Sequence, residues 1–206
     1  MRVLVPFDAE RPKTRLADLL DERERSALAR AMLADVLAAV RAAGGEPTVL
    51  STAPIDVDAP VRVDDRALTP AVNDVLADAV PESSVAVVMA DLALATDDAL
   101  ADLFASEGDV AIVPGRGGGT NALVVRHPEF RVDYHGLSYR DHRRIAEEID
   151  ADVAVADSHR LSTDVDERAD LVELLLHGDG RATAWLRDAG FELVVEGGRA
   201  DVTRSP

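Results

Sequence analysis

The chain has 206 residues, 47% of them apolar and only 3% aromatic, which suits one domain with a core built mainly from alanine, valine and leucine. Its 39 acidic residues outnumber the 22 basic ones, and the net charge of −17 disfavours binding to nucleic acid or to an anionic membrane. Cysteine is absent, which excludes disulfides and thiolate metal sites. Because the acids are spread along the whole chain, we interpret them as a halophilic adaptation to a salt-rich cytoplasm.

The sequence contains no apolar run of about 18 residues, so no membrane span is predicted. Residues 1–6 run directly into a strand-like segment and lack the apolar region and cleavage site of a signal peptide. A cytoplasmic location is therefore expected.

Apolar runs typical of strands alternate along the chain with apolar residues at helical spacing. Strands are predicted at 2–7, 47–51, 85–90, 110–114, 121–126 and, as a strand or the approach to one, 160–164. Helices are predicted at 22–43, 68–80 (with a break near Pro70), 96–106 (with Thr96 as N-cap), 138–149, 167–177 and 181–189, and a terminal hairpin at 191–203. This alternation predicts an α/β sandwich with a mainly parallel sheet. We expect a single domain over residues 1–206, with 178–206 as a C-terminal helix and hairpin appendage.

A basic loop follows the first predicted strand. It carries Arg11, Lys13 and Arg15, and Lys13 is the one lysine among basic residues that are otherwise all arginine. Ligands bind at the carboxyl ends of strands in such sheets, and these cations could meet a triphosphate there. The loop lacks the glycine pattern of a Walker loop. The alternative is a solvated loop balanced by neighbouring acids, and in either case we expect Lys13 to be exposed.

Three aspartates are candidate metal ligands. Asp91 follows the fully apolar run at 85–90, where an unpaired carboxylate would carry a desolvation cost. Asp164 and Asp166 point to the same side if their segment is extended. Together they would make an oxygen site suited to Mg²⁺. The alternatives are a turn residue for Asp91 and a helix cap for Asp166.

Polar residues also gather around a glycine-rich turn at 115–119, which is followed by Thr120 and Asn121. Successive glycines let backbone N–H groups approach an anion, although a flexible hairpin turn is the more usual meaning. Ser138 is predicted to cap a helix whose N-terminus suits a phosphate or a carboxylate. His135 and His142 are the best-placed histidines, and both could equally be surface residues.

Taken together, these motifs resemble the 2-phospho-L-lactate guanylyltransferase family of deazaflavin coenzyme (F-420) biosynthesis. The matching elements run from the first strand to about residue 176. They are Lys13-Thr14-Arg15-Leu16, Asp91, Gly118-Gly119-Thr120-Asn121-Ala122-Leu123, Ser138 with His142, and Asp164-Val165-Asp166. The chain departs from the family pattern at Phe7-Asp8, where Val-Lys is common, and at Ala93, where proline is expected. The glycine-rich stretch before Ser138 is also reduced to Gly136.

The resemblance implies a three-layer α/β/α sandwich of the nucleotide-diphospho-sugar transferase type, and transfer of GMP from GTP to 2-phospho-L-lactate with release of pyrophosphate. It implies Mg²⁺ at Asp91, Asp164 and Asp166, with Lys13 and Arg15 stabilising the pyrophosphate. Nucleotide contacts are also expected from Arg11 and from Asn73, which could bind the base. Acceptor contacts are expected from Gly118, Gly119, Thr120, Asn121 and Ser138.

Some alternatives stay open at this point. Phosphoenolpyruvate could replace 2-phospho-L-lactate, and the same fold also serves nucleotidyltransferases that act on a sugar phosphate or a molybdopterin. A non-catalytic nucleotide-binding protein is the rival from another class, and three acidic residues placed for a metal argue against it. Whether the chain is a monomer or a homodimer is also open.

Overall fold

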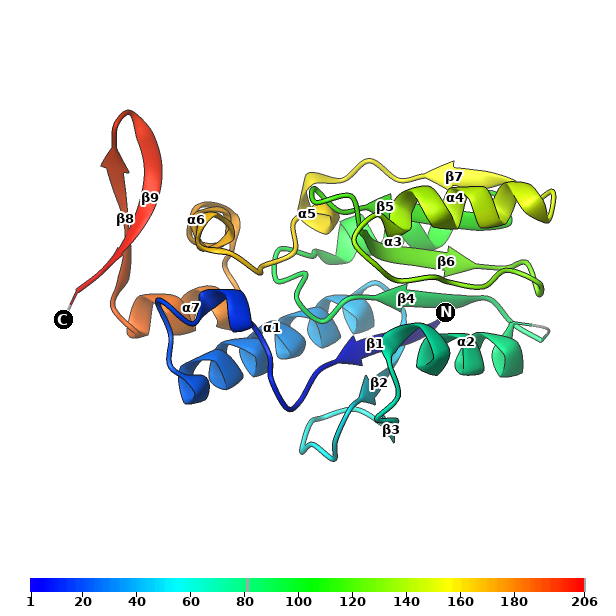
Figure 1. The fold of residues 1–206 in the computed structure, drawn as a ribbon, viewed down its shortest axis with the longest axis horizontal. Coiled ribbons are helices and arrows are strands. Elements are labelled where there is room, and N and C mark those ends of the chain that lie inside the picture. Colours follow the sequence, from blue (N-terminus) through cyan, green and yellow to red (C-terminus); the bar gives the residue numbers. More distant parts are fainter. Residues whose placement is uncertain (81, 206) are drawn as a thin grey trace.

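The computed structural model describes residues 1–80 and 82–205, and within them seven strands form one mixed sheet (Figure 1). Its order is β3-β2-β1-β4-β6-β5-β7, in which only β6 runs antiparallel to its neighbours within the described residues. The strands are β1 (Arg2–Phe7), β2 (Glu46–Ser51), β3 (Val61–Val63), β4 (Val85–Val88), β5 (Val110–Pro114), β6 (Thr120–Val125) and β7 (Val153–Val155). The prediction of an α/β fold with a mainly parallel sheet is confirmed.

Helices cover both faces of this sheet and produce three layers. One face packs against α1 (Glu22–Ala42), α3 (Asp97–Ala105), α5 (His159–Ser162), α6 (Arg168–His177) and α7 (Arg181–Asp188). The other face packs against α2 (Leu68–Ala79) and α4 (Ser138–Glu148). The two apolar clusters use alternate residues of the same strands: Val3 and Val5 face one cluster and Leu4 faces the other.

Local signals explain where the helices begin. Asp21 and Glu24 form a capping box at the start of α1, and the Thr96 hydroxyl accepts a hydrogen bond from the Ala99 N–H at 3.3 Å, as predicted for α3. Pro70 lies in the first turn of α2, where a missing N–H is tolerated, so the expected break near it does not occur. Ser138 does not cap α4, because the N-cap is Leu137.

The C-terminal segment, which comprises α7 and the hairpin after it, packs on the main body against α1 and α6 (Figure 1). Its hairpin pairs β8 (Phe191–Glu196) with β9 (Arg199–Arg204), as predicted. Phe191 and Val202 belong to the large apolar cluster, and Asp35 on α1 accepts hydrogen bonds from the first N–H groups of α7, at 2.8 Å from Arg181 and from Ala182. This packing is compatible with one domain.

Three regions differ from the expected elements. The edge strands β3 and β7 are only three residues long and have no distinct apolar run, so the sequence did not indicate them. The predicted strand at 160–164 is wrong, because the chain forms the helix α5 and then the irregular residues 163–166. The Ser158 side chain caps α5 by accepting from the Leu161 N–H at 3.3 Å.

The strand directions gather the polar loops at one edge of the sheet. β1 and β4 are parallel, so the loops after Phe7 and after Val88 leave the sheet at the same edge. Because β6 is antiparallel to β4, with Ala122 opposite Val88, its first residues also lie at this edge. The topology therefore brings the basic loop, Asp91 and the Thr120-Asn121 pair to one place.

The described part of the chain contains no helix with both the length and the apolar character needed to cross a lipid bilayer.

Candidate active site at the carboxyl edge of the sheet

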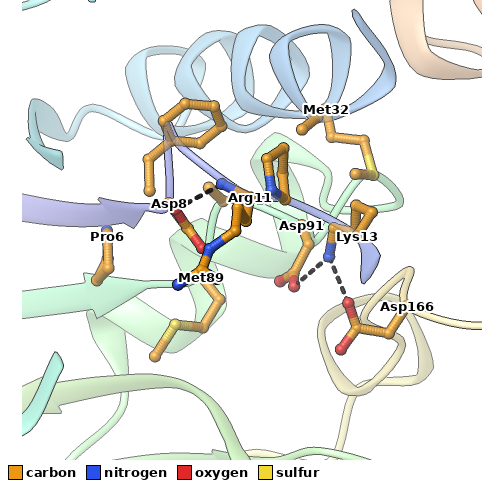
Figure 2. Close-up of a pocket in the computed structure, with 12 residues that line it drawn as sticks. Pro6, Asp8, Arg11, Lys13, Met32, Met89, Asp91 and Asp166 are labelled. Atoms are coloured by element: carbon orange, nitrogen blue, oxygen red, sulfur yellow. Dashed lines mark hydrogen bonds and ion pairs between the residues drawn. The ribbon is translucent and has the colours of Figure 1, made fainter. Parts of the chain in front are cut away.

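A pocket of about 230 Å³ opens where β1 and β4 end (Figure 2). Asp8, Arg11 and Lys13 reach it from the loop after β1, and Asp91 and Asp166 reach it from the segments after β4 and α5. Its apolar wall is formed by Pro6, Phe7, Pro12, Ala29, Met32, Met89 and Ala90. The pocket thus has an apolar side and a charged side.

Lys13 is at the centre of the charged side. Figure 2 shows its ammonium between two carboxylates, with Nζ 2.7 Å from Oδ2 of Asp91 and 2.6 Å from Oδ1 of Asp166. Its side chain is only 8% exposed, so the expectation of an exposed lysine is wrong. The reason is that the two carboxylates draw the ammonium inward and compensate its burial.

The backbone of Lys13 is also unusual. Its φ of 54° places it in the left-handed region, which a residue with a side chain adopts only at a cost of roughly 1–2 kcal/mol. Lys13 is the N-cap of the short 3-10 helix Thr14–Leu16 that follows. Strain of this kind is retained where the fold over-determines a conformation, often at functional sites.

The electrostatics of the Lys13 centre depend on burial. Burial alone would lower the Lys13 pKa, but Asp91 and Asp166 outweigh it and hold that pKa above its usual value. Burial raises the pKa of Asp91, and Lys13 opposes part of this shift. Oδ1 of Asp91 is buried and has no hydrogen-bond partner. The site therefore contains one carboxylate oxygen with unused capacity for a cation.

The three predicted metal ligands do not converge on one point in this structure. Asp166 contacts Lys13, whereas Oδ1 of Asp164 accepts a hydrogen bond from Nδ2 of Asn121 at 3.1 Å. In the part of the chain that the structure describes, the group of three ligand atoms found within 4.8 Å of one another lies elsewhere, on α5 and α6. Lys13 links Asp91 to Asp166, and the helix cap that was considered for Asp166 is provided by Glu167.

The glycine-rich turn is closed by its own backbone. The Gly115 N–H donates to the Gly119 carbonyl at 2.8 Å, and the Gly118 N–H donates to the Gly115 carbonyl at 3.0 Å. A Cβ at Gly115 would lie 2.3 Å from Oδ1 of Asn121, so only glycine fits there. Gly118 has a φ of +89°, which also favours glycine. These N–H groups are held in a tight turn beside Asn121.

Thr120, Asn121 and Ser138 are buried and bonded to other parts of the protein. The Thr120 N–H donates to Oγ of Ser138 at 3.0 Å, and the Asn121 amide donates to the Leu161 carbonyl at 3.1 Å. The network joins β6 to α4 and α5. The predicted acceptor-binding residues thus lie together, in a buried network that supports the edge of the sheet.

His142 completes this network as a neutral imidazole. It is fully buried, and its Nε2 accepts a hydrogen bond from the Asp133 N–H at 2.9 Å, so the ring proton is on Nδ1 and points to Oγ1 of Thr120, 2.9 Å away. Burial lowers its pKa to about 4. Of the two roles considered for His142, the surface role is wrong.

We expect this histidine to make the fold sensitive to acid. The folded protein holds His142 neutral down to about pH 4, whereas the same histidine in the unfolded chain is protonated below about pH 6.5. The contribution of His142 to the free energy of unfolding is therefore complete above pH 6.5 and is lost as the pH falls toward 4. A shift of this size corresponds to about 3 kcal/mol. Denaturant unfolding at pH 7 and pH 4 should show that the wild type loses about 3 kcal/mol more of its free energy of unfolding than His142→Gln does. Parallel pH dependence of the free energy of unfolding in the two proteins would contradict it, and His127→Gln, at a half-buried histidine, is the matched control.

The remaining predicted contacts are more peripheral. Arg11 lines the pocket, and the Arg15 side chain is 67% exposed with its guanidinium 3.3 Å from Glu167. The Asn73 amide is already used, because it donates to the Val132 carbonyl at 2.9 Å and accepts from the Val132 N–H at 2.8 Å. His135 is half-exposed, with Nε2 3.1 Å from Asp141.

Several pocket residues had no distinct signal in the sequence. Met32 and Met89 form part of the apolar wall, but on α1 and after β4 they read only as core positions. Asp8 was expected as a departure from the family pattern and as one of the acids that balance the basic loop, and its Oδ1 accepts hydrogen bonds from the N–H groups of Glu10 and Arg11, at 3.0 and 3.2 Å. Its place directly after the end of β1 could have indicated this role in shaping the loop.

A model of the family described as "Guanylyl transferase CofC like" matches residues 1–205. The chain belongs to this family. It is 63% identical over 204 residues to a 2-phospho-L-lactate guanylyltransferase of Halomicrobium mukohataei, covering 99% of this chain and all of the relative. A protein with the same name from Halorubrum lacusprofundi is 59% identical over 216 residues, with 99% and 100% coverage. The halophile sources agree with our interpretation of the acidic composition.

Solved structures support the fold of this guanylyl transferase family member. A nucleotide-diphospho-sugar transferase structure from Desulfovibrio desulfuricans G20 matches with a TM-score of 0.71, covering 91% of this chain and 94% of the other. A transferase structure from Thermus thermophilus matches with a TM-score of 0.56, covering 84% and 100%. At 18% and 19% identity these matches show the fold alone. The three-layer fold expected from the sequence is thereby confirmed.

Proposed function

We propose that the chain transfers the guanylyl group of GTP to 2-phospho-L-lactate and releases pyrophosphate, a step in deazaflavin coenzyme biosynthesis. The observation that carries the proposal is the full-length identity to proteins named for this activity. The pocket supports it, because its buried lysine and strand-end carboxylates suit a phosphate-transfer reaction. In that reaction a phosphate oxygen of the acceptor bonds to the α-phosphorus of GTP, and the bond between the α-phosphorus and the bridging oxygen to the β-phosphorus breaks.

This chemistry asks for positioning and charge neutralisation more than for proton transfer. The acceptor oxygen is already ionised, so no strong general base is needed. Lys13 and Arg11 are the cations that line the pocket, and we assign them to the triphosphate. We assign Arg15, which is next along the loop and largely exposed, to the departing pyrophosphate on the solvent side.

The carboxylates fit a divalent cation. Three aspartates and one lysine leave two negative charges at the site, and Oδ1 of Asp91 is buried without a partner. Mg²⁺ prefers oxygen ligands of this kind. We propose that Asp91 and Asp166 hold Mg²⁺ with support from Asp164, and the ion when bound would neutralise charge on the phosphate oxygens.

We place the acceptor beside the glycine-rich turn. Gly118, Gly119, Thr120, Asn121 and Ser138 offer backbone N–H groups and short polar side chains, which suit a compact phosphate with an adjacent carboxylate. Several of these groups now bond to one another, so acceptor binding would use or exchange these hydrogen bonds. A pyranose would need an aromatic platform, and the chain has only seven aromatic residues. The role of Asn73 toward the base remains a prediction.

Competition between acceptors tests this proposal. With GTP and Mg²⁺ at equal acceptor concentrations, we expect the guanylylated 2-phospho-L-lactate to dominate over any nucleotide sugar when products are scored by mass. Phosphoenolpyruvate should compete closely, because a small apolar difference supplies only about 1–3 kcal/mol of discrimination. Preferential formation of a nucleotide sugar would contradict the acceptor assignment. No pyrophosphate release with any pair would favour a non-catalytic nucleotide-binding protein.

A further inference from the structure

A second cluster of metal-ligating side chains lies outside the pocket, on α5 and α6. His159 is the first residue of α5, and Glu173 and His177 lie one turn apart on α6. Nε2 of His159 is 3.3 Å from Oε2 of Glu173, and Nε2 of His177 is 3.6 Å from the same oxygen. In the described part of the chain, this is the group of three potential ligands whose atoms all lie within 4.8 Å of one another.

The spacing of these three atoms fits a tetrahedral ion. Bonds of about 2.0–2.1 Å to a tetrahedral zinc ion place neighbouring ligand atoms roughly 3.3 Å apart. The two measured separations from Glu173 are close to this value. Both histidines are exposed and Glu173 is half-buried, so solvent can fill a fourth position.

We propose that His159, Glu173 and His177 bind a zinc-type divalent ion that ties α5 to α6. The donor set is two imidazole nitrogens and one carboxylate oxygen, which zinc accepts readily and Mg²⁺ does not favour. The site is thus chemically distinct from the all-carboxylate centre at Asp91 and Asp166. The proposal does not depend on which reaction the pocket performs.

The position of the cluster means that a bound ion would affect the neighbouring segment between α5 and α6. Residues 163–167, which include Asp164 and Asp166, connect α5 to α6 and have no regular structure. The two helices are already joined by a hydrogen bond from the Arg160 guanidinium to the His177 carbonyl at 3.4 Å. A bound ion would hold together the helices on either side of this connection and so restrict the segment that carries Asp164 and the pocket residue Asp166.

Calorimetric titration of the full chain with zinc chloride tests the site directly. In molar KCl, which screens weak binding by the acidic surface, we expect one zinc ion per chain. His159→Asn and His177→Asn should each weaken this binding by at least about tenfold, because ligand loss exceeds the effect of losing an outer-shell partner. His127→Asn, a matched change at a half-buried histidine outside the cluster, should bind zinc as the wild type does. Mg²⁺ should not compete.

Two further readouts separate a metal site from a simple ion pair. Zinc at about a hundred times its Kd should raise the Tm of the wild type by about 5–10 °C, but not the Tm of Glu173→Gln. Hydrogen exchange of residues 163–167 should slow with zinc in the wild type only. The proposal would be overturned if the wild type bound no stoichiometric zinc. It would also be overturned if His135→Asn lost zinc binding while His159→Asn retained it.

Discussion

Replacing Lys13 by alanine is expected to lower kcat/KM for GTP by roughly 100- to 1,000-fold, the cost of removing one preorganised charge from a transition state. The ammonium is fixed between Asp91 and Asp166 beside the pocket, so its charge is in place before substrate arrives. Lys13→Arg should recover only part of the activity, because a planar guanidinium cannot occupy the position of a compact ammonium. Pyrophosphate release is the measurement.

The same variant is expected to lose stability as well. Removing Lys13 leaves the partly buried Asp91 carboxylate, whose Oδ1 is buried and has no partner, without its cation, which we expect to cost about 2 kcal/mol in the free energy of unfolding. Arg30→Ala removes a positive charge from the exposed surface of α1 and serves as the control for both measurements. Near-normal turnover of Lys13→Ala would remove this residue from the phosphate site.

Asp91→Asn is expected to separate activity from stability. The amide keeps the shape of the side chain but loses the charge that would hold Mg²⁺, so we predict a loss of roughly 100-fold or more in kcat/KM at any Mg²⁺ concentration. Burial raises the pKa of Asp91, which means that the ionised carboxylate opposes folding. The variant also removes one of the two carboxylates beside the buried Lys13 ammonium, so the two effects oppose each other, and the free energy of unfolding at neutral pH should change little compared with the loss of activity.

Steady-state kinetics with a Mg²⁺ titration and denaturant unfolding would measure both effects. Asp98→Asn, an exposed change in the first turn of α3, should leave both quantities near the wild-type values. An Asp91→Asn protein with full activity and reduced stability would mean that the carboxylate is structural.

The long, periodic elements of this fold were predictable because their signals are local. The apolar run at 85–90 and the apolar stripe of α1 each specify one element and its buried face. The three-residue edge strands β3 and β7 have no such signal, because they are defined by pairing with β2 and β5. The strand prediction for residues 160–164 was wrong for a related reason, because the cap from Ser158 favours a helix over a weak strand propensity.

The candidate site was only partly predictable from the sequence. Strand-end logic placed Lys13 and Asp91 at one edge, and the structure brings them together with Asp166. The sequence could not show that Lys13 is buried, because this burial depends on two carboxylates that lie 78 and 153 residues away along the chain. Nor could it show that Asn121 holds Asp164, because this contact exists only through the antiparallel placement of β6.

The most direct test of the central claim is a crystal of the full chain grown with Mn²⁺ and a non-hydrolysable GTP analogue. We predict an anomalous peak within coordination distance, about 2.1 Å, of carboxylate oxygens of Asp91 and Asp166, with the triphosphate beside Lys13. A nucleotide and metal bound elsewhere on the chain, with the ammonium of Lys13 still enclosed by its two aspartates, would contradict the assignment of this pocket as the site of guanylyl transfer.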